Sequence, residues 1–144
     1  RAQDLGLQRQ GHVANFIEKQ RAFVGLLEAP YPVSHGTGER AFAVAEQIRQ
    51  GAIGRAVLLC GTGIGMAISA NKVLGIRAAQ AHDTYSAERA RKSNDAQILS
   101  IGARVIGAEL AKSIVKSFLE SEFESARSGA KVERINAIER DGHQ

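Results

Sequence analysis

The sequence predicts an α/β fold in which a parallel sheet carries helices on both faces. Short apolar runs alternate with amphipathic segments from residue 22 to residue 123. A length of 144 residues is typical of one domain with one core. The hydrophobic fraction of 44% and the charged fraction of 24% are globular values. We therefore expect a single α/β domain over 1–124, followed by a tail over 125–144.

The first half of the chain is expected to form two helices and two strands. Apolar residues at helical spacing predict an amphipathic helix over 8–20. The compact apolar run "AFVGLLE" predicts a strand over 22–28, and the proline- and glycine-rich "APYPVSHGTGE" after it predicts a surface loop. An apolar stripe predicts a helix over 39–51 that closes at a glycine, and "RAVLLC" over 55–60 is typical of a buried strand.

The second half continues the alternation. In order, a helix, a strand, a helix, a strand and a helix are expected over 65–73, 75–81, 83–94, 96–103 and 107–123. Asp83 and Thr84 are candidate N-caps, with Glu88 in reach for a capping box. The tail over 125–144 has few apolar residues to bury, so we expect it to pack across a neighbouring subunit or to fray.

Composition argues against several classes of partner. The net charge is +4, but 19 basic residues are interleaved with 15 acidic ones and form no block, which argues against nucleic acid. No apolar run approaches the roughly 20 residues that a membrane-spanning helix needs. The lone cysteine, Cys60, cannot form an internal disulfide, so we expect a reducing cytoplasm.

The lone cysteine ends an apolar run and is followed by three glycines in five residues, "GTGIG". A glycine-rich turn between a strand and a helix exposes backbone N–H groups that favour anions, and the same helix end favours a thiolate. The spacing fits neither a dinucleotide fingerprint nor a P-loop. What remains is an oxyanion or phosphate cradle beside a thiol, or a small buried cysteine that ends a strand.

Other polar residues are expected at the same edge of the sheet. Ligands of open α/β sheets bind beyond the carboxyl ends of the strands. Cys60, the segment 82–84 and Arg104 all lie at or just beyond predicted strand ends. His82 is a candidate for orienting a ligand, or equally a structural histidine beside the carboxylate of Asp83.

The motifs in "CGTGIG…ANK…GIRAA…HDTYSA…ND…GARVIG" closely resemble the ribose-5-phosphate isomerase type B family, which includes the galactose-6-phosphate isomerase subunits. The resemblance covers about residues 39–138. It implies a Rossmann-like three-layer α/β/α sandwich that forms a homodimer or homotetramer with shared active sites. The implied reaction is the interconversion of an aldose phosphate and its ketose phosphate, of the ribose 5-phosphate/ribulose 5-phosphate type, without metal or cofactor.

The resemblance also assigns roles to residues. Cys60 would carry a proton between C1 and C2 through a cis-enediolate, with Thr62 hydrogen-bonded near the sugar and Asn94 on a substrate hydroxyl. The backbone amides that would hold the oxyanion are those of Gly61, Gly63, Ile64 and Gly65. The side chains that would hold the phosphate are those of Arg104, Arg127 and Lys131.

The sequence departs from the family pattern in the "RKSND" segment, in the tail and in the N-terminal part. Ser93 stands where relatives carry a histidine before "ND" that opens the furanose ring, and Ser128 replaces another histidine. Lys131 replaces an arginine, which keeps the charge but loses the bidentate fork. The N-terminal part lacks the "DHAG"-like turn and the "DYPDYA" segment, so we expect the first strand to be missing or replaced.

Two functions fit these residues. One is an aldose–ketose isomerase acting on a short or already open-chain sugar phosphate, for which no ring-opening histidine is needed. The other is a non-catalytic sugar-phosphate-binding or partner subunit of the same fold. Retention of Cys60 and Thr62 favours the enzyme.

Overall fold

A computed structural model describes residues 33–35 and 38–142. The predicted helix over 8–20, the predicted strand over 22–28 and the N-terminal part, where we expect the first strand to be missing or replaced, lie outside these residues. Within them the elements alternate along the chain as expected. They are β1 (Val33–His35), α2 (Gly38–Arg49), β2 (Ala56–Cys60), α3 (Ile64–Ala70), β3 (Ala78–Gln80), α4 (Thr84–Asn94), β4 (Ile98–Gly102), α5 (Ala108–Glu120) and α6 (Ser125–Asp141).

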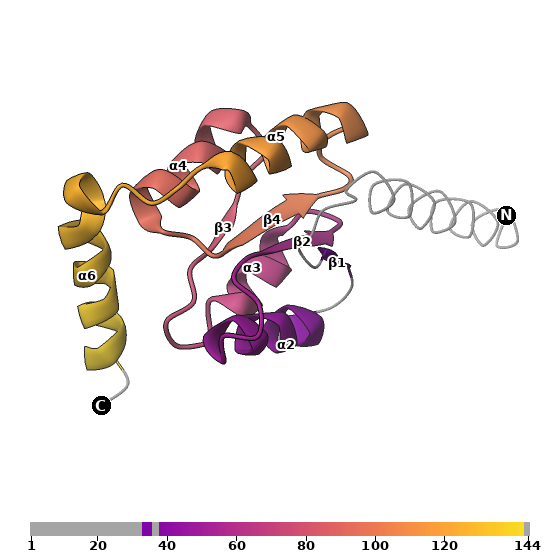
Figure 1. The fold of residues 1–144 in the computed structure, drawn as a ribbon. Helices are drawn as coiled ribbons and strands as arrows, with labels where there is room; N and C mark the ends of the chain where they lie inside the picture. Colours follow the sequence, from indigo (N-terminus) through magenta and orange to yellow (C-terminus); the bar gives the residue numbers. More distant parts are fainter. Residues whose placement is uncertain (1–32, 36–37, 143–144) are drawn as a thin grey trace, which may run out of the picture.

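The four strands form one parallel sheet in the order β1-β2-β4-β3. The helices α2 and α3 cover one face, and α4 and α5 cover the other (Figure 1). This arrangement is a three-layer α/β/α sandwich, as predicted. The helices α2, α3 and α4 each connect one strand to the next along the chain, which is the connection that parallel pairing requires.

Alternation along the central strands divides the core in two. In β2, Val57 and Leu59 pack toward α4 and α5, whereas Leu58 packs toward α2 and α3. Phe118 of α5 is fully buried on the first side and Met66 of α3 on the second. Because both faces of the central strands are buried, their sequences are apolar except for Ser100 in β4, which is why these strands were predicted correctly.

Two element predictions differ from the structure, one because a strand was missed and one because a strand was too long. The segment expected to be a surface loop contains β1, which pairs with β2 through Val33 and Val57. The predicted strand over 75–81 shrinks to three residues, because Gly75 has a φ of 80° and the amide of Ile76 donates to Val73 in a turn. Ile76 lies in that turn, and its side chain is buried in the core.

The start of α4 follows the predicted N-cap but not the predicted capping box. Asp83 is extended, and one of its carboxylate oxygens accepts a 2.7 Å hydrogen bond from the amide of Ser86. Glu88 instead forms ion pairs with Arg89 and Lys92 on the helix surface.

The tail forms a helix and is therefore not frayed. Its first turn is tied to the end of α4 by the amide of Glu124, which donates to the carbonyl of Lys92 at 3.1 Å. Val132 is buried, whereas Ile135 and Ile138 are 43% and 72% exposed. In Figure 1, α6 stands at the end of the molecule where the strands begin. Whether the tail also packs on a second subunit stays a prediction.

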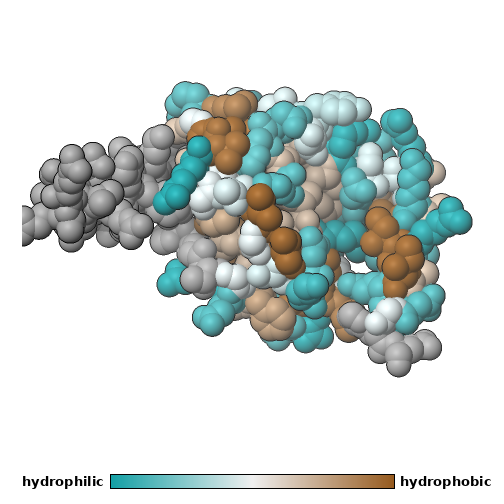
Figure 2. Space-filling model, turned by 180° about the vertical axis from the view of Figure 1, so that it is seen from behind, coloured by the Kyte–Doolittle hydropathy of each residue, from teal (hydrophilic) through white to brown (hydrophobic). Residues whose placement is uncertain are grey.

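The described surface is mixed in character. Seen from behind, apolar side chains form separate groups among polar ones (Figure 2). Within 33–35 and 38–142, no helix combines the length and the apolar character needed to cross a membrane.

Candidate active site

Cys60 ends β2 at the carboxyl edge of the sheet, and the following turn folds back on its sulfur. The side chain is half-buried, and the amide of Gly63 donates to Cys60 Sγ at 3.1 Å. Gly63 has a φ of 79°, a left-handed conformation that residues with a Cβ rarely adopt. The glycine thus lets the chain turn sharply enough for an amide to reach the thiol.

The same turn packs tightly against β4. A Cβ on Gly63 would lie 3.0 Å from the carbonyl carbon of Ile101, and one on Gly102 would lie 2.7 Å from the carbonyl of Thr62. The hydroxyl of Ser100 donates to the carbonyl of Gly63 at 2.6 Å. Ser100 was not predicted as part of the site, because its only signal in the sequence is a polar residue inside an otherwise apolar strand.

Two of the four amides predicted to bind the oxyanion are already engaged. The amide of Gly63 donates to the sulfur, and that of Ile64 donates to Thr62 Oγ1 at 3.3 Å. The first backbone hydrogen bond of α3 runs from the amide of Ala67 to Gly63. The amides of Gly65 and Met66 precede that bond, so the helix itself offers them no acceptor.

Arg104 lies beside the turn formed by residues 60–63, here called the thiol turn, as predicted for a residue after β4. The amides of residues 103 and 104 donate to the carbonyls of Cys60 and Gly61 at 2.8 and 3.1 Å. The side chain of Arg104 extends over Gly61, since a Cβ on this glycine would lie 3.7 Å from Arg104 Cδ and 3.8 Å from Nε. The structure therefore brings the Cys60 thiol, the glycines after it and the side chain of Arg104 together at the carboxyl ends of the strands.

Three other predicted site residues lie near the amino-terminal ends of the strands, at the opposite end of the sheet from Cys60. Asn94 ends α4, where its carbonyl accepts a 2.9 Å hydrogen bond from Nε of Arg77, the residue just before β3. Arg127 and Lys131 are exposed on α6, and Arg127 pairs loosely with Glu124 at 3.7 Å. Within one chain, these three side chains are not part of the group around Cys60.

His82 and Asp83 have structural partners. The imidazole of His82 accepts a hydrogen bond from the amide of Gly102 at 2.8 Å through Nε2. Hydrogen bonds from the side chain and backbone of Ser86 hold the pKa of the Asp83 carboxyl below its ordinary value of 3.8. Asp83 is thus ionised as a helix cap.

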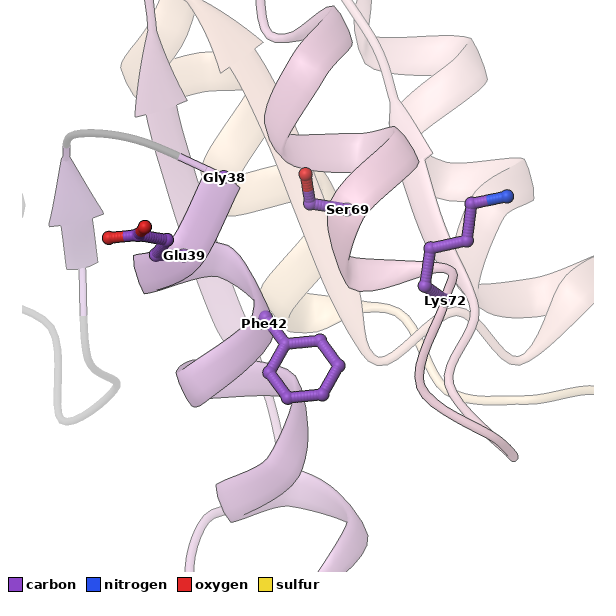
Figure 3. A pocket seen from close by; sticks show the side chains of 5 residues that line it. All are labelled: Gly38, Glu39, Phe42, Ser69 and Lys72. Atoms are coloured by element: carbon purple, nitrogen blue, oxygen red, sulfur yellow. The ribbon is translucent and has the colours of Figure 1, made fainter.

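A cavity of about 370 Å³ lies between α2 and α3, lined by Gly38, Glu39, Phe42, Ser69 and Lys72. Glu39 and Lys72 extend in opposite directions, with the Phe42 ring between them (Figure 3). Because its polar groups do not converge and Cys60 is not in its lining, this cavity is not the predicted site. Across the described part of the chain, no group of three His, Cys, Asp or Glu side chains is arranged to hold a metal ion.

The α/β/α fold, with a thiol in a glycine turn at the carboxyl edge of a parallel sheet, agrees with the class that the motifs predicted, the sugar-phosphate isomerases. A family model described as Ribose/Galactose Isomerase matches residues 6–135. This chain belongs to that family, and the resemblance to the ribose-5-phosphate isomerase type B family is confirmed.

Individual relatives support the assignment. The chain is 59% identical to a D-erythrulose-4-phosphate isomerase of Pectobacterium atrosepticum, over 72% of this chain and 69% of the relative. It is 56% identical to a ribose-5-P isomerase B of Listeria innocua, over 67% and 65%, so the match spans just under two thirds of that protein. The solved ribose-5-phosphate isomerase B of Clostridium thermocellum is 42% identical, with a TM-score of 0.71 over 72% of this chain and 70% of the other. The chain is therefore similar to sugar-phosphate isomerases in both sequence and fold.

Proposed function

We propose that this chain interconverts an aldose phosphate and its ketose phosphate, with Cys60 as the base. The observation that carries the proposal is the packing of the Cys60 turn beneath the side chain of Arg104, at the edge where open α/β sheets bind ligands. The two named relatives, a D-erythrulose-4-phosphate isomerase and a ribose-5-P isomerase B, act on phosphorylated sugars, which supports the same chemistry.

The reaction needs only proton movements. The Cys60 thiolate removes the proton from C2 of the aldose. The electrons of the broken C–H bond form a C1–C2 double bond, and the carbonyl electrons move to O1. Return of the proton to C1, with transfer of the hydroxyl proton from O2 to O1, completes the ketose. Isomerisation is therefore balanced without an oxidant or a cofactor, and it passes through a cis-enediolate.

The developing negative charge requires donors that the protein does not already use. The amides of Gly65 and Met66 meet this condition better than those of Gly63 and Ile64, which bond inside the turn. Gly61 is the remaining candidate from the sequence. A preorganised donor of this kind is often worth about 3 kcal/mol in the transition state.

We further propose that the substrate is a four-carbon sugar phosphate. In a tetrose 4-phosphate the phosphate esterifies O4, the oxygen that would close a furanose ring, so the sugar stays open. Such a substrate needs no ring-opening base, and Ser93 is then tolerated where relatives carry a histidine. The 59% identical relative is named for this substrate class, D-erythrulose 4-phosphate.

We also propose that two copies of the chain complete each site. Asn94, Arg127 and Lys131 lie at the opposite edge of the sheet from Cys60, so they reach a substrate at Cys60 only from a second subunit. Ile64 and Ile68 of α3, exposed by 50% and 56%, offer apolar surface beside the thiol turn for such a contact. A cytoplasmic location stays part of this proposal.

Solvent deuterium exchange at C2, followed by NMR, tests the chemistry directly. D-erythrose 4-phosphate and D-ribose 5-phosphate are compared in the wild-type chain and in Cys60→Ala. We expect faster turnover of the four-carbon sugar, and a loss of about 10²- to 10⁴-fold in kcat without the thiol. Exchange with neither sugar would favour the alternative of a non-catalytic sugar-phosphate-binding subunit.

Two further variants separate substrate choice from phosphate binding. Ser93→His is expected to raise kcat/KM for ribose 5-phosphate and to leave that for erythrose 4-phosphate unchanged. Arg104→Ala is expected to raise KM much more than it lowers kcat, because phosphate binding is shared by the ground and transition states. Equal losses in kcat and kcat/KM would contradict the assigned role of Arg104.

Mixing two inactive variants tests the shared site. In random dimers of Cys60→Ala and Asn94→Ala chains, half of the dimers are mixed and each has one intact site. About a quarter of wild-type activity should then return. Without any recovery on mixing, Asn94 does not act across subunits.

A further inference from the structure

Beyond the end of β3, the side chain of His82 accepts a hydrogen bond from β4 that a backbone carbonyl of β3 would otherwise accept. The strand β3 stops at Gln80, and its last link to β4 is the amide of Ala81, which donates to Ser100 at 3.2 Å. The strand β4 continues to Gly102, whose amide faces the same side as that of residue 100, because strand residues alternate. On that side, Nε2 of His82 accepts the Gly102 amide at 2.8 Å. The imidazole thus takes the part of the next carbonyl of a longer β3.

The hydrogen bond defines the state of the ring. A backbone amide can only donate, so Nε2 must be the unprotonated nitrogen. The ring that makes this bond is therefore neutral, with its proton on Nδ1. Leucine at this position would leave the Gly102 amide without this acceptor, whereas the Oε1 atom of glutamine stands the same number of bonds from the backbone as Nε2.

Gly102 begins the turn that carries Arg104, and that turn is held from two sides. On the β2 side, the amides of residues 103 and 104 donate to Cys60 and Gly61. Close contact with Thr62 leaves no room for a side chain on Gly102. On the β3 side, the hydrogen bond to His82 holds the first residue of the turn.

We propose that His82 is a positioning residue for the isomerisation. By holding Gly102, its neutral imidazole fixes the turn 102–104 and so keeps the side chain of Arg104 over Gly61, beside the thiol. This role rests on the proposed function in one respect, that Arg104 binds the substrate phosphate. His82 itself does not touch the substrate.

The test compares His82→Leu, which removes the acceptor, with His82→Gln, which keeps one. For erythrose 4-phosphate, the leucine variant should raise KM about tenfold and change kcat by less than about twofold, because phosphate binding is uniform across the reaction. The glutamine variant should stay within about threefold of wild-type KM, since the hydrogen bond is retained. Equal increases in KM in the two variants would overturn the proposal.

A double-mutant cycle with Arg104→Ala distinguishes positioning from general destabilisation. If His82 acts through Arg104, then His82→Leu should add no further increase in KM when Arg104 is already alanine. A tenfold increase in KM when His82→Leu is added to Arg104→Ala would refute the positioning role of His82.

Hydrogen exchange of the Gly102 amide, measured by NMR on the full chain, gives a readout independent of catalysis. Protection should fall at least tenfold in His82→Leu and persist in His82→Gln, because only leucine removes the acceptor. Unchanged protection in the leucine variant would overturn the proposal even in an active enzyme. If the wild-type chain isomerises no sugar phosphate, the proposed function fails, and this exchange together with a titration by inorganic phosphate decides the role of His82.

Discussion

Gly63→Ala tests whether the thiol turn is as tightly packed against β4 as the structure indicates. Gly63 combines a φ of 79° with backbone atoms of β4 at 3.0 to 3.2 Å from the position of a Cβ. Gly51, at the end of α2, has nearly the same φ, 76°, but no atom within 4 Å of that position. Gly51→Ala is therefore a matched control that isolates the contact with β4.

The expected magnitudes follow from these two differences. A left-handed conformation costs a residue with a Cβ about 1 to 2 kcal/mol, and both variants share this cost. The contact with β4 adds a penalty of the kind found on overpacking, about 1 to 3 kcal/mol, because backbone yields less than a flexible side chain. Gly51→Ala should thus lose about 1 to 2 kcal/mol of stability and Gly63→Ala about 2 to 5 kcal/mol.

Urea unfolding followed by circular dichroism measures both variants against the wild type. Their m-values should match, so that the shift in midpoint reports stability rather than a change in the unfolded state. If Gly63→Ala and Gly51→Ala lose the same stability within about 0.5 kcal/mol, the turn is not packed against β4 as inferred.

Three other changes test the packing and electrostatics around the site. Phe118→Ala, at a fully buried position, should cost about 3 to 5 kcal/mol in urea unfolding, and a loss below about 1 kcal/mol would contradict its central place in the core. Asp83→Ala should lower the unfolding midpoint and Asp83→Asn should largely retain it, because asparagine can still accept the hydrogen bond from Ser86. Hydrogen bonding and charge from Arg55 lower the pKa of Glu122 below its ordinary value of 4.5. Glu122 therefore stabilises the fold above pH 4.5, and this contribution is lost as the pH falls through the lowered pKa. Glu122→Gln should be less stable than the wild type at neutral pH and equal to it in acid, as measured by urea midpoints across pH.

The elements that were predicted correctly carry strong local signals. The strand Ala56–Cys60 is an unbroken apolar run, and α4 begins after Asp83, whose short side chain caps the helix. The element that was missed, β1, has three residues between a proline and a glycine, which local preference alone assigns to a loop. Its pairing with β2 outweighs that preference, and pairing depends on residues more than twenty positions away.

In the candidate site, too, some features could be predicted from the sequence and others could not. The glycine turn after Cys60 could be predicted because its residues are consecutive in the chain, and Arg104 because strand ends of a parallel sheet meet at one edge. Neither the hydrogen bond from Gly102 to His82 nor that from Ser100 to Gly63 could be predicted, because each joins residues from different elements.

The sequence by itself determined the alternation of strands and helices, the sharp turn beside the lone thiol, and the family to which the chain belongs. Only the tertiary structure decided that Arg104 lies over Gly61, that His82 takes the place of a missing strand, and that Asn94 lies at the far edge of the sheet. The physical reason is that turns and helix caps depend on neighbouring residues, whereas the strand order β1-β2-β4-β3 results from packing two apolar faces at once.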